Sequence, residues 1–497
     1  MIRPEASNAK SLLELARFLG IEIEDQNHAE IIFNGVVSDT RSIIPGDLFV
    51  ALPGSKSHGA AFVVEIKAAG AVAVLTDKQG AQFISGVLPT LIIADPRRAV
   101  GDCASWFYGS PSQNISVIGI TGTNGKTTTT ALLNQIWRYA ERETGLIGTV
   151  GIEIGAEVLP TSFTTPEAAD LQSLFAVMQE RHVRNVAMEV SSHAIAMNRI
   201  NSARFRMVGF TNLTQDHLDF HLDMANYFAT KRRLFTSEFA DLGFVNIDDS
   251  YGAELFAARD IPMISLSRSN PKAEWYFESA DMNSNGYSVT LRGTGGIQIS
   301  GELGLIGDHN LDNLLMATAM AFQSDVDPIV IGNSFRYLTG APGRLERIEL
   351  GQEFKALVDY AHTPDAVERT LATLRKSTKG RLIAVLGCGG DRDRSKRPIM
   401  GKALQEGSDT AIFTSDNPRS ESADEILNEM TKGLVLSTSS HVVSDRREAI
   451  ALAVASAQPG DCVVVLGKGH ETGQEISGVK HPFDDRLELA RAIEELT

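Results

Sequence analysis

The sequence predicts an α/β protein with three domains in series, of which the central one has a mostly parallel sheet flanked by helices. The 497 residues are too many for one compact domain. From about residue 115, short apolar runs alternate with helical stretches, a pattern typical of parallel strands covered by helices on both faces. A small α/β pattern ends near residue 100, and a Gly- and Pro-bearing segment at 339–347 begins another unit. We therefore expect domains at 1–100, 101–340 and 341–497.

The composition indicates a soluble globular chain: 43% of its residues are hydrophobic and 22% are charged. A formal net charge of −16 argues against nucleic acid or an anionic membrane as the main partner. The three cysteines are widely spaced, so neither a disulfide framework nor a zinc site is expected. The first 20 residues lack the pattern of a signal peptide, and no run of about 18 apolar residues occurs. We expect a cytoplasmic protein, without membrane insertion, that acts as a monomer.

The predicted elements of the first two domains follow from local patterns. Leu12, Leu15, Ala16 and Leu19 form one helical stripe that Gly20 ends. A β-rich run at 115–120 leads through a glycine-rich turn into a helix over 127–140. Further buried strands are expected at 184–190, 205–210 and 242–247. Residues 280–302 read as an antiparallel appendage, and a helix should follow residues 307–313.

The third domain has its own strands, expected at 382–387, 410–415 and 462–467, with helices between them. This alternation predicts a Rossmann-like α/β domain. The last helix should place Leu489, Ala492, Ile493 and Leu496 on one face.

Polar, glycine-rich segments follow directly after six of the predicted strands. They read TGTNGKT, EVSSH and TNLTQDH in the central domain, and GCGGDRDRSKRP, SDNPRSE and GKGHE in the third. In open α/β sheets, ligands bind outside the carboxyl ends of the strands. We therefore expect these segments to form the functional site.

The first of these segments indicates a phosphate-binding loop. A strand precedes it and a helix follows it, and Gly122, Gly125, Lys126 and Thr127 fit the pattern, although Ile120 occupies a position where glycine is usual. Backbone N–H groups in such a loop bind phosphate oxygens, the lysine bridges the β- and γ-phosphates, and the Thr hydroxyl ligates Mg²⁺. The expected ATP-binding residues here are Gly122, Thr123, Asn124, Gly125, Lys126, Thr127 and Thr128.

A resemblance to a known family covers the whole chain. Nine motifs occur in the order found in the Mur ligases of peptidoglycan synthesis. They are TGTNGKTTTT, TTPE (164–167), MEVSSHAI (188–195), TNLTQDHLDFH (211–221), YFATKRRLF (227–235), DYAHTPDA (359–366), GCGGDRDRSKRP (387–398), DNPR (416–419) and GKGHE (467–471). The chain resembles most the MurE type, which extends UDP-N-acetylmuramoyl-L-alanyl-D-glutamate. DNPR resembles the form found in enzymes that add meso-diaminopimelate.

The resemblance implies a ligase reaction. ATP phosphorylates the D-glutamate γ-carboxylate, which gives an acyl phosphate and ADP, and an amine then displaces phosphate. Phosphorylation removes the charge that repels nucleophiles and supplies a leaving group. Because two anions must meet first, Mg²⁺ and cationic side chains are required at the contact. The implied partners are UDP-MurNAc-dipeptide, ATP and meso-diaminopimelate, with two Mg²⁺ ions.

Four residues carry the implied chemistry: Lys126, Glu189, His217 and Lys231. Glu189 ends a strand and suits Mg²⁺ beside Thr127, although it also reads as a solvated strand-end carboxylate. His217 by itself reads as a structural histidine, and Lys231 as a solvated cation on a helix. The family resemblance makes His217 a ligand of a second Mg²⁺ and Lys231 a carbamylated lysine that binds metal.

The resemblance also implies where the substrates bind. The first domain would bind the nucleotide end of the UDP substrate through Ser38, Thr40, Ser55, Lys56 and Ser57. The central domain would bind its peptide end through Thr164, Thr165, Ser191 and Arg199. Asn310 and Arg344, with Asp359 or His362, would approach ATP. Substrates held by separate domains imply closure about a hinge near residue 340.

The amine donor is expected in the third domain. Diaminopimelate differs from lysine by a distal carboxylate, which the planar guanidinium groups of Arg419 and Arg392 suit. The full set of residues implied for this substrate is Arg392, Asp416, Asn417, Pro418, Arg419, Gly467 and Glu471.

Four other functions fit the sequence less well. An L-lysine-adding ligase of the same type is the nearest alternative, and DNPR argues against it. The SDTR and PGDLFVAL segments of the first domain argue against a folylpolyglutamate synthetase-like enzyme. A P-loop switch or binding module would give DYAHTP, GCGGDRD and GKGHE no role, and a non-enzymatic scaffold would not need Lys126, Glu189, His217 and Lys231.

Overall fold

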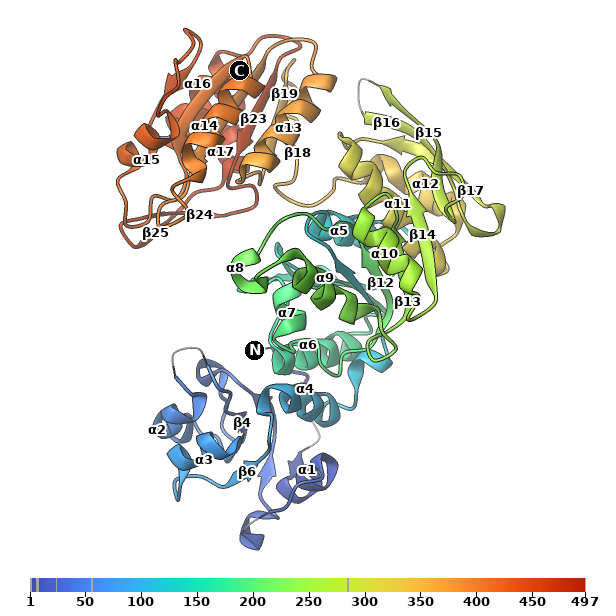
Figure 1. Cartoon of the computed structure of the whole chain (residues 1–497), viewed down its shortest axis with the longest axis vertical. Helices are drawn as coiled ribbons and strands as arrows, with labels where there is room; N and C mark the ends of the chain where they lie inside the picture. Colours follow the sequence, from blue (N-terminus) through green and yellow to red (C-terminus); the bar gives the residue numbers. More distant parts are fainter. Residues whose placement is uncertain (1, 6–8, 24, 55–56, 284–285, 497) are drawn as a thin grey trace. The chain divides into compact units, whose positions relative to one another are not determined.

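The computed structural model describes residues 2–5, 9–23, 25–54, 57–283 and 286–496. It contains three main sheets in chain order, so the predicted α/β class is confirmed (Figure 1). By contacts the chain forms two compact units. The first comprises Met1–Glu278, Leu291–Ile299 and Asp312–Ser334, and the second comprises Ser279–Thr290, Ser300–Leu311 and Phe335–Thr497. The three domain boundaries expected from the sequence stay predictions.

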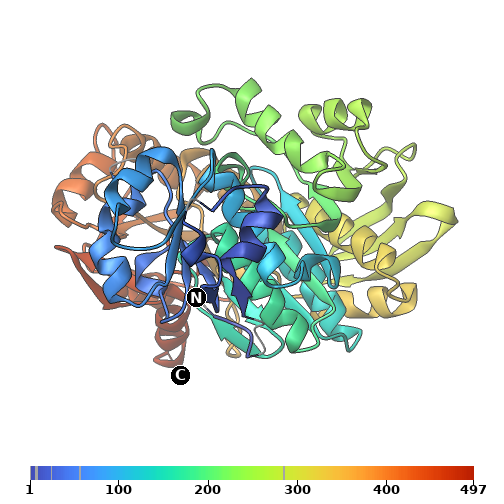
Figure 2. The same ribbon diagram turned by 90° about the horizontal axis from the view of Figure 1, so that it is seen from below.

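The N-terminal region, drawn in blue in Figures 1 and 2, has a four-stranded parallel sheet in the order β3-β4-β5-β6. The predicted first helix is present: Gly20 ends it in the left-handed conformation, at φ 65°. The elements are β1 Lys10–Ser11, α1 Leu12–Leu19, β2 Ile32–Phe33, β3 Val36–Val37, β4 Leu48–Val50, α2 Val63–Ala68, β5 Ala73–Thr76, α3 Lys78–Ile84, β6 Thr90–Ile92 and α4 Pro96–Phe107.

The second sheet has eleven strands in the order β10-β9-β8-β11-β7-β12-β13-β14-β15-β16-β17. The seven strands β8-β11-β7-β12-β13-β14-β15 are parallel to one another, whereas β9 is antiparallel to both β8 and β10. The strands are β7 Ser116–Thr121, β8 Thr144–Gly148, β9 Gly151–Ile154, β10 Glu157–Leu159, β11 Asn185–Glu189, β12 Phe205–Phe210, β13 Ala240–Asn246, β14 Met263–Ser267, β15 Trp275–Asn283, β16 Gly286–Arg292 and β17 Gln298–Leu303.

Helices connect many of these strands and pack on the sheet. Leu171 and Phe175 of α6 pack with Val186 and Phe210 in one buried core. A Cβ atom on Gly209 of β12 would lie 2.7 Å from the Met316 sulfur, so helix α11 packs closely on that strand. The helices are α5 Lys126–Tyr139, α6 Ala168–Glu180, α7 Ser192–Ala196, α8 Leu218–His221, α9 Met224–Arg232, α10 Ser250–Ala258, α11 Asp308–Gln323 and α12 Pro328–Ser334. Helix α11 begins inside residues 307–313, whereas the sequence placed its start after them.

The third sheet has the order β18-β19-β23-β20-β21-β22. Strand β20 is buried on both faces: Leu382, Ala384 and Leu386 join one core, and Ile383 and Val385 join the other. The elements are β18 Glu346–Arg347, β19 Lys355–Asp359, α13 Pro364–Ser377, β20 Leu382–Cys388, α14 Lys396–Gly407, β21 Thr410–Ser415, α15 Ala423–Met430, β22 His441–Val442, α16 Arg446–Ala455, β23 Cys462–Leu466, β24 Gly473–Ile476, β25 Val479–Pro482 and α17 Asp485–Glu494.

The final helix departs in one detail from its predicted face. Leu489, Ala492 and Ile493 are buried, as expected. Leu496 lies beyond the end of α17 and is 51% exposed, so its place on the buried stripe was wrong. Within the described residues, no helix is long and apolar enough to cross a membrane.

Candidate active site

The glycine-rich loop connects β7, in the middle of the large sheet, to α5. Gly122 has φ 149°, and a Cβ atom there would lie 1.9 Å from the Thr211 hydroxyl oxygen. Gly125 has φ 86°, and its Cβ atom would lie 2.4 Å from Asn313 Oδ1. Any side chain would therefore collide with the neighbouring segments, and the loop needs glycine at both positions.

The segment after β12 supports this loop. The Thr123 N–H donates to the Asn212 carbonyl at 2.9 Å, and the Asn124 N–H donates to Asn212 Oδ1 at 3.0 Å. The Thr123 hydroxyl donates to the Thr214 carbonyl at 3.2 Å. Two of the polar segments that the sequence placed at strand ends therefore meet, as expected for neighbouring parallel strands.

Lys126 is the first residue of α5, and its side chain folds back over the loop. Its Nζ atom donates to the carbonyl oxygens of Gly122 at 3.0 Å and Thr123 at 2.9 Å. The ammonium group is thus held at the loop, where a phosphate group would need a cation.

Glu189 and Thr127 form the second feature of the site. The Thr127 hydroxyl donates to Glu189 Oε2 at 2.9 Å, and the Thr149 N–H donates to Glu189 Oε1 at 2.7 Å. Glu189 is 1% exposed, which contradicts the alternative of a solvated strand-end carboxylate. A buried carboxylate beside a hydroxyl provides the oxygen ligands that a hard cation such as Mg²⁺ prefers.

Lys231, on α9, is also buried, so the reading as a solvated helix cation was wrong. Its side chain is 1% exposed, its Nζ atom donates to the Gly122 carbonyl at 2.9 Å, and it lies 4.8 Å from the centroid of the Tyr227 ring. Burial, followed by repulsion from Lys126, holds the pKa of Lys231 well below its ordinary value. This environment favours a neutral amine.

His217, which the family resemblance makes a metal ligand, precedes α8 and has φ 53°. His193 and His221, which the sequence did not indicate, lie near it. The ring centroid of His193 lies 4.8 Å from that of His217, and His221 Nε2 lies 2.9 Å from the Ser192 hydroxyl. Burial is the main cause that lowers the pKa of all three imidazoles. Within the described residues, no three His, Cys, Asp or Glu side chains are grouped closely enough to hold a metal ion.

The residues expected to contact the peptide end of the UDP substrate lie next to Glu189. The Thr165 hydroxyl donates to the Glu189 carbonyl at 2.9 Å and accepts from the Ser191 N–H at 3.1 Å. The Thr164 hydroxyl lies 3.0 Å from that of Thr149. Arg199 Nε lies 2.9 Å from Glu167 Oε1, so its charge is already paired.

The expected nucleotide-end residues belong to the N-terminal sheet. Ser38 follows β3, Thr40 is in the next turn, and Ser57 lies in the segment after β4. In the described part of the chain, none of these three forms a hydrogen bond or ion pair with the residues around Glu189. Ser55 and Lys56 lie outside the described residues.

The second unit joins several of the residues expected to bind the amine donor. Asn417 Nδ2 donates to Asp416 Oδ1 at 3.0 Å and to Glu471 Oε2 at 2.9 Å. Lys468, which the sequence analysis did not select, is fully buried and donates to both Asn417 Oδ1 and Glu471 Oε2 at 3.1 Å. Burial raises the pKa of Asp416, and a Cβ atom on Gly467 would lie 2.8 Å from its Oδ2 atom.

The side chains of Arg419 and Arg392 both lie close to Gly389. A Cβ atom on Gly389 would lie 2.9 Å from Arg419 Nη1 and 3.7 Å from Arg392 Cγ. Arg419 Nη1 donates to the Gly390 carbonyl at 2.6 Å, and a Cβ atom on Gly390 would lie 1.9 Å from the Pro418 carbonyl oxygen. The close packing of the two loops brings the Arg419 guanidinium group near the stem of the exposed Arg392 side chain. A planar guanidinium group suits a carboxylate.

A buried ion pair fixes the strand ends that carry these loops. Arg446 Nε and Nη2 donate to the Asp485 carboxylate at 2.8 and 2.6 Å, and both side chains are fully buried. Arg446 Nη1 also donates to the Ser415 carbonyl at 3.0 Å, and Nη2 to the Leu466 carbonyl at 2.9 Å. Arg446 therefore ties the last residue of β21 to the last residue of β23.

The residues expected near ATP in the second unit contact neighbouring groups of that unit. Asn310 Nδ2 donates to the Ile306 carbonyl at 2.8 Å, and the Arg344 guanidinium lies 4.6 Å from the centroid of the Tyr360 ring. Asp359 is buried and accepts from the Leu345 and Ala361 N–H groups at 2.8 and 2.9 Å. His362 is exposed and lies 2.8 Å from the Tyr360 carbonyl through Nδ1.

Comparison with known proteins agrees with this geometry. Three family models match in order: "Mur ligase family, catalytic domain" at residues 33–102, "Mur ligase middle domain" at 120–321 and "Mur ligase, glutamate ligase domain" at 343–469. The chain is similar to UDP-N-acetylmuramoyl-L-alanyl-D-glutamate–2,6-diaminopimelate ligases from Streptomyces coelicolor, at 46% identity over 99% of this chain and 98% of that protein, and from Syntrophomonas wolfei, at 40% identity over 97% and 99%.

A solved structure of a protein with the same enzyme name aligns with a TM-score of 0.72 at 33% identity, covering 97% of this chain and 98% of that chain. The matches run through the phosphate loop, the Thr127–Glu189 pair and the loops that carry Arg392 and Arg419. The chain belongs to the Mur ligase family.

Proposed function

We propose that this chain is an ATP-dependent ligase that joins meso-2,6-diaminopimelate to the D-glutamate γ-carboxylate of UDP-N-acetylmuramoyl-L-alanyl-D-glutamate. The products are the tripeptide-linked nucleotide, ADP and phosphate. The similarity to diaminopimelate ligases along nearly the full chain supports this assignment. The observation that carries it is the proximity of Arg392 and Arg419, whose side chains both approach Gly389.

The phosphate loop would catalyse the first half-reaction, which is phosphorylation of the carboxylate by ATP. The γ-carboxylate oxygen attacks the γ-phosphorus of ATP, the bond to the bridging oxygen breaks, and ADP leaves. Lys126 moves from the loop carbonyls to the phosphate oxygens and stabilises the charge of the transferring group. Mg²⁺, when bound, neutralises the phosphate charge, and Thr127 and Glu189 would hold one such ion. Asn310 and Arg344 are proposed to bind the rest of the nucleotide.

A second ion would require His217 and a modified Lys231. The neutral Lys231 amine attacks CO₂, forms an N–C bond and releases one proton to solvent. The resulting carbamate provides two anionic oxygens in place of an ammonium group. The low pKa of Lys231 supports this modification, because only the unprotonated amine reacts.

The loops of the second unit would position the amine for the second half-reaction, in which it attacks the acyl phosphate. A deprotonated amine of diaminopimelate attacks the acyl carbon, and the C–O bond to phosphate breaks. Arg419 and Arg392 would bind the distal carboxylate, and Gly467 and Glu471 would receive the distal ammonium group. Asp416 and Asn417 would shape the loop. Lysine lacks that carboxylate and would leave the two guanidinium groups without this partner, so discrimination of about 10²–10⁵ is expected.

The remaining substrate contacts are proposed from the family resemblance. Ser38, Thr40 and Ser57 would bind the nucleotide end, and Thr164, Thr165, Ser191 and Arg199 the peptide end, for which Arg199 must exchange its pairing with Glu167. We also propose that the enzyme works as a monomer in the cytoplasm. The domain boundaries and the hinge near residue 340 stay predictions.

Phosphate release from ATP tests the proposal. Release should require both UDP-MurNAc-L-Ala-D-Glu and meso-diaminopimelate, and L-lysine assayed in parallel should support it at least about 10²-fold less efficiently. Lys126→Ala provides the control for contaminating ATPases. Equal rates with lysine would favour the lysine-adding alternative, and full release without the nucleotide substrate would refute ligase activity.

A further inference from the structure

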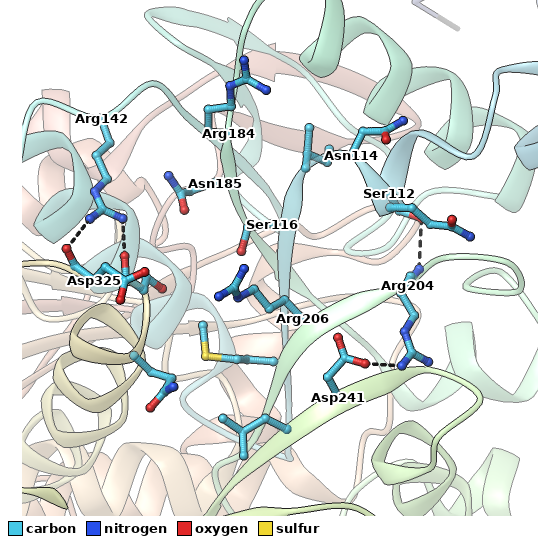
Figure 3. A pocket seen from close by; sticks show the side chains of 16 residues that line it. Ser112, Asn114, Ser116, Arg142, Arg184, Asn185, Arg204, Arg206, Asp241 and Asp325 are labelled. Carbon is cyan, nitrogen blue, oxygen red and sulfur yellow. Dashed lines mark hydrogen bonds and ion pairs between the residues drawn. The ribbon is translucent and has the colours of Figure 1, made fainter. Parts of the chain in front are cut away.

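A cavity of about 850 Å³ lies at the amino-terminal ends of the central strands of the first unit. Ser116 of β7, Asn185 of β11, Met207 of β12 and Leu242 of β13 line it (Figure 3). The phosphate loop follows the other end of β7, and a six-residue strand spans about 20 Å. The cavity is therefore separate from the candidate active site, and none of its lining residues has a role there.

Arginines dominate the charge of this cavity. Arg142, Arg184, Arg204 and Arg206 line it, against the aspartates Asp241 and Asp325. Such a concentration of positive charge is unusual in a chain whose formal net charge is −16. Its lining therefore disfavours an apolar ligand and favours an anionic one.

Two of the four arginines serve the fold. Arg142 donates to the Ser324 carbonyl and, at 2.7 Å, to the Asp325 carbonyl, so it binds the end of helix α11. Arg204 pairs with Asp241 and donates to the Ser237 carbonyl at 2.6 Å.

The other two arginines have no such partners. Within the described residues, the guanidinium groups of Arg184 and Arg206 take part in no hydrogen bond or ion pair, and both side chains are exposed. Figure 3 shows the Arg206 guanidinium inside the cavity near Ser116, with Asn185 and Asn114 on its walls. Two free guanidinium forks with nearby amide groups provide the donors that phosphate oxygens bind.

We propose that this cavity binds a small polyanion carrying two or more phosphate groups, held by Arg184 and Arg206. The volume suits a molecule of nucleotide size, since ligand pockets occupy about 300–1,000 Å³. The free cations provide the charge, and Ser116, Asn114 and Asn185 provide neutral polar contacts. This site is independent of the proposed ligase reaction.

A single introduced thiol reports binding at this site. The protein's cysteines, Cys103, Cys388 and Cys462, are all buried, so Asn114→Cys would supply the accessible thiol. The rate of its labelling by neutral iodoacetamide is measured with and without inorganic tripolyphosphate. The Lys126→Ala background removes the phosphate loop as a source of the effect.

We expect tripolyphosphate at about 1 mM to slow the labelling of Asn114→Cys at least about threefold, and added salt to reverse this protection. Arg184→Gln with Arg206→Gln should abolish the protection. Arg336→Gln, which changes an exposed arginine elsewhere, should retain it. Unchanged labelling with tripolyphosphate, or protection that persists without Arg184 and Arg206, would overturn the proposal.

Discussion

Lys231 and Lys126 donate to the same carbonyl oxygen, that of Gly122, at 2.9 and 3.0 Å. Two ammonium groups at one oxygen, one of them almost fully buried, repel each other strongly. Loss of the proton from Lys231 relieves this repulsion, because Lys126 must stay charged to bind phosphate. The arrangement therefore favours a neutral amine at Lys231.

Replacing Lys231 with alanine should abolish ligase activity, because no other group at this position can supply carbamate oxygens. A small added carboxylate such as acetate should restore part of the phosphate release. Lys231→Arg is the matched variant, since it keeps a cation that cannot be carbamylated and should stay inactive with or without acetate. Incorporation of ¹³C-labelled CO₂ should give a carbamate NMR signal in the protein that retains Lys231 and none in either variant. Full activity of Lys231→Ala would contradict the carbamate.

The sequence predicted the elements around Lys231 but not the burial of its side chain. The pattern of strands and polar segments predicted the sheets, the phosphate loop and the nearness of Thr127 to Glu189, because parallel strand order fixes which loops meet. The burial of Lys231 could not be predicted, since α9 carries no clear apolar stripe. Lys468, His193 and Arg446 were missed because their roles depend on contacts made only in the folded chain. Leu496 was placed on a helical face that ends before it.

Arg419 should determine the affinity for diaminopimelate. Arg419→Ala should raise the KM for diaminopimelate about 10²-fold or more and change the KM for ATP by less than about twofold, because one fork of the carboxylate site is lost. Arg419→Lys should behave similarly, since a point charge cannot bind a carboxylate in bidentate geometry. Steady-state phosphate release at varied substrate concentrations measures both constants.

The backbone at Arg419 requires a second variant. Arg419 has φ 52°, in the left-handed region that asparagine tolerates better than alanine. Arg419→Asn therefore removes the guanidinium with less strain and should reproduce the effect on KM. Arg369→Ala removes an exposed arginine from α13 and should leave both constants unchanged. Equal increases in both KM values would argue against a specificity role.

The Arg446–Asp485 pair should contribute strongly to the stability of the second unit. Arg446→Met leaves the Asp485 carboxylate buried without its partner, which typically costs about 3–5 kcal/mol. Urea unfolding followed by circular dichroism should show a lower midpoint. The adjacent Arg447 is largely exposed and pairs with Glu488, so Arg447→Met should lower the midpoint less than Arg446→Met does. Replacing both Arg446 and Asp485 with apolar residues should be less damaging than Arg446→Met alone; an equal or larger loss would contradict this account.

His470 should make stability depend on pH in the acid range. Burial and, next, the charge of Arg344 lower the pKa of His470 to about 4 from an ordinary value of 6.5. As the pH falls below about 6.5, the unfolded chain therefore binds this proton before the folded chain does, and folding loses stability until about pH 4. His470→Gln cannot gain the proton and does not lose this stability. As the pH is lowered from 7.5 to 4.5, roughly across the titration range, its urea midpoint should therefore rise relative to that of the protein with His470. His481→Gln replaces an exposed histidine and provides the matched control. A difference between His470→Gln and the unmodified protein that stays constant with pH would show that His470 is not held neutral by its surroundings.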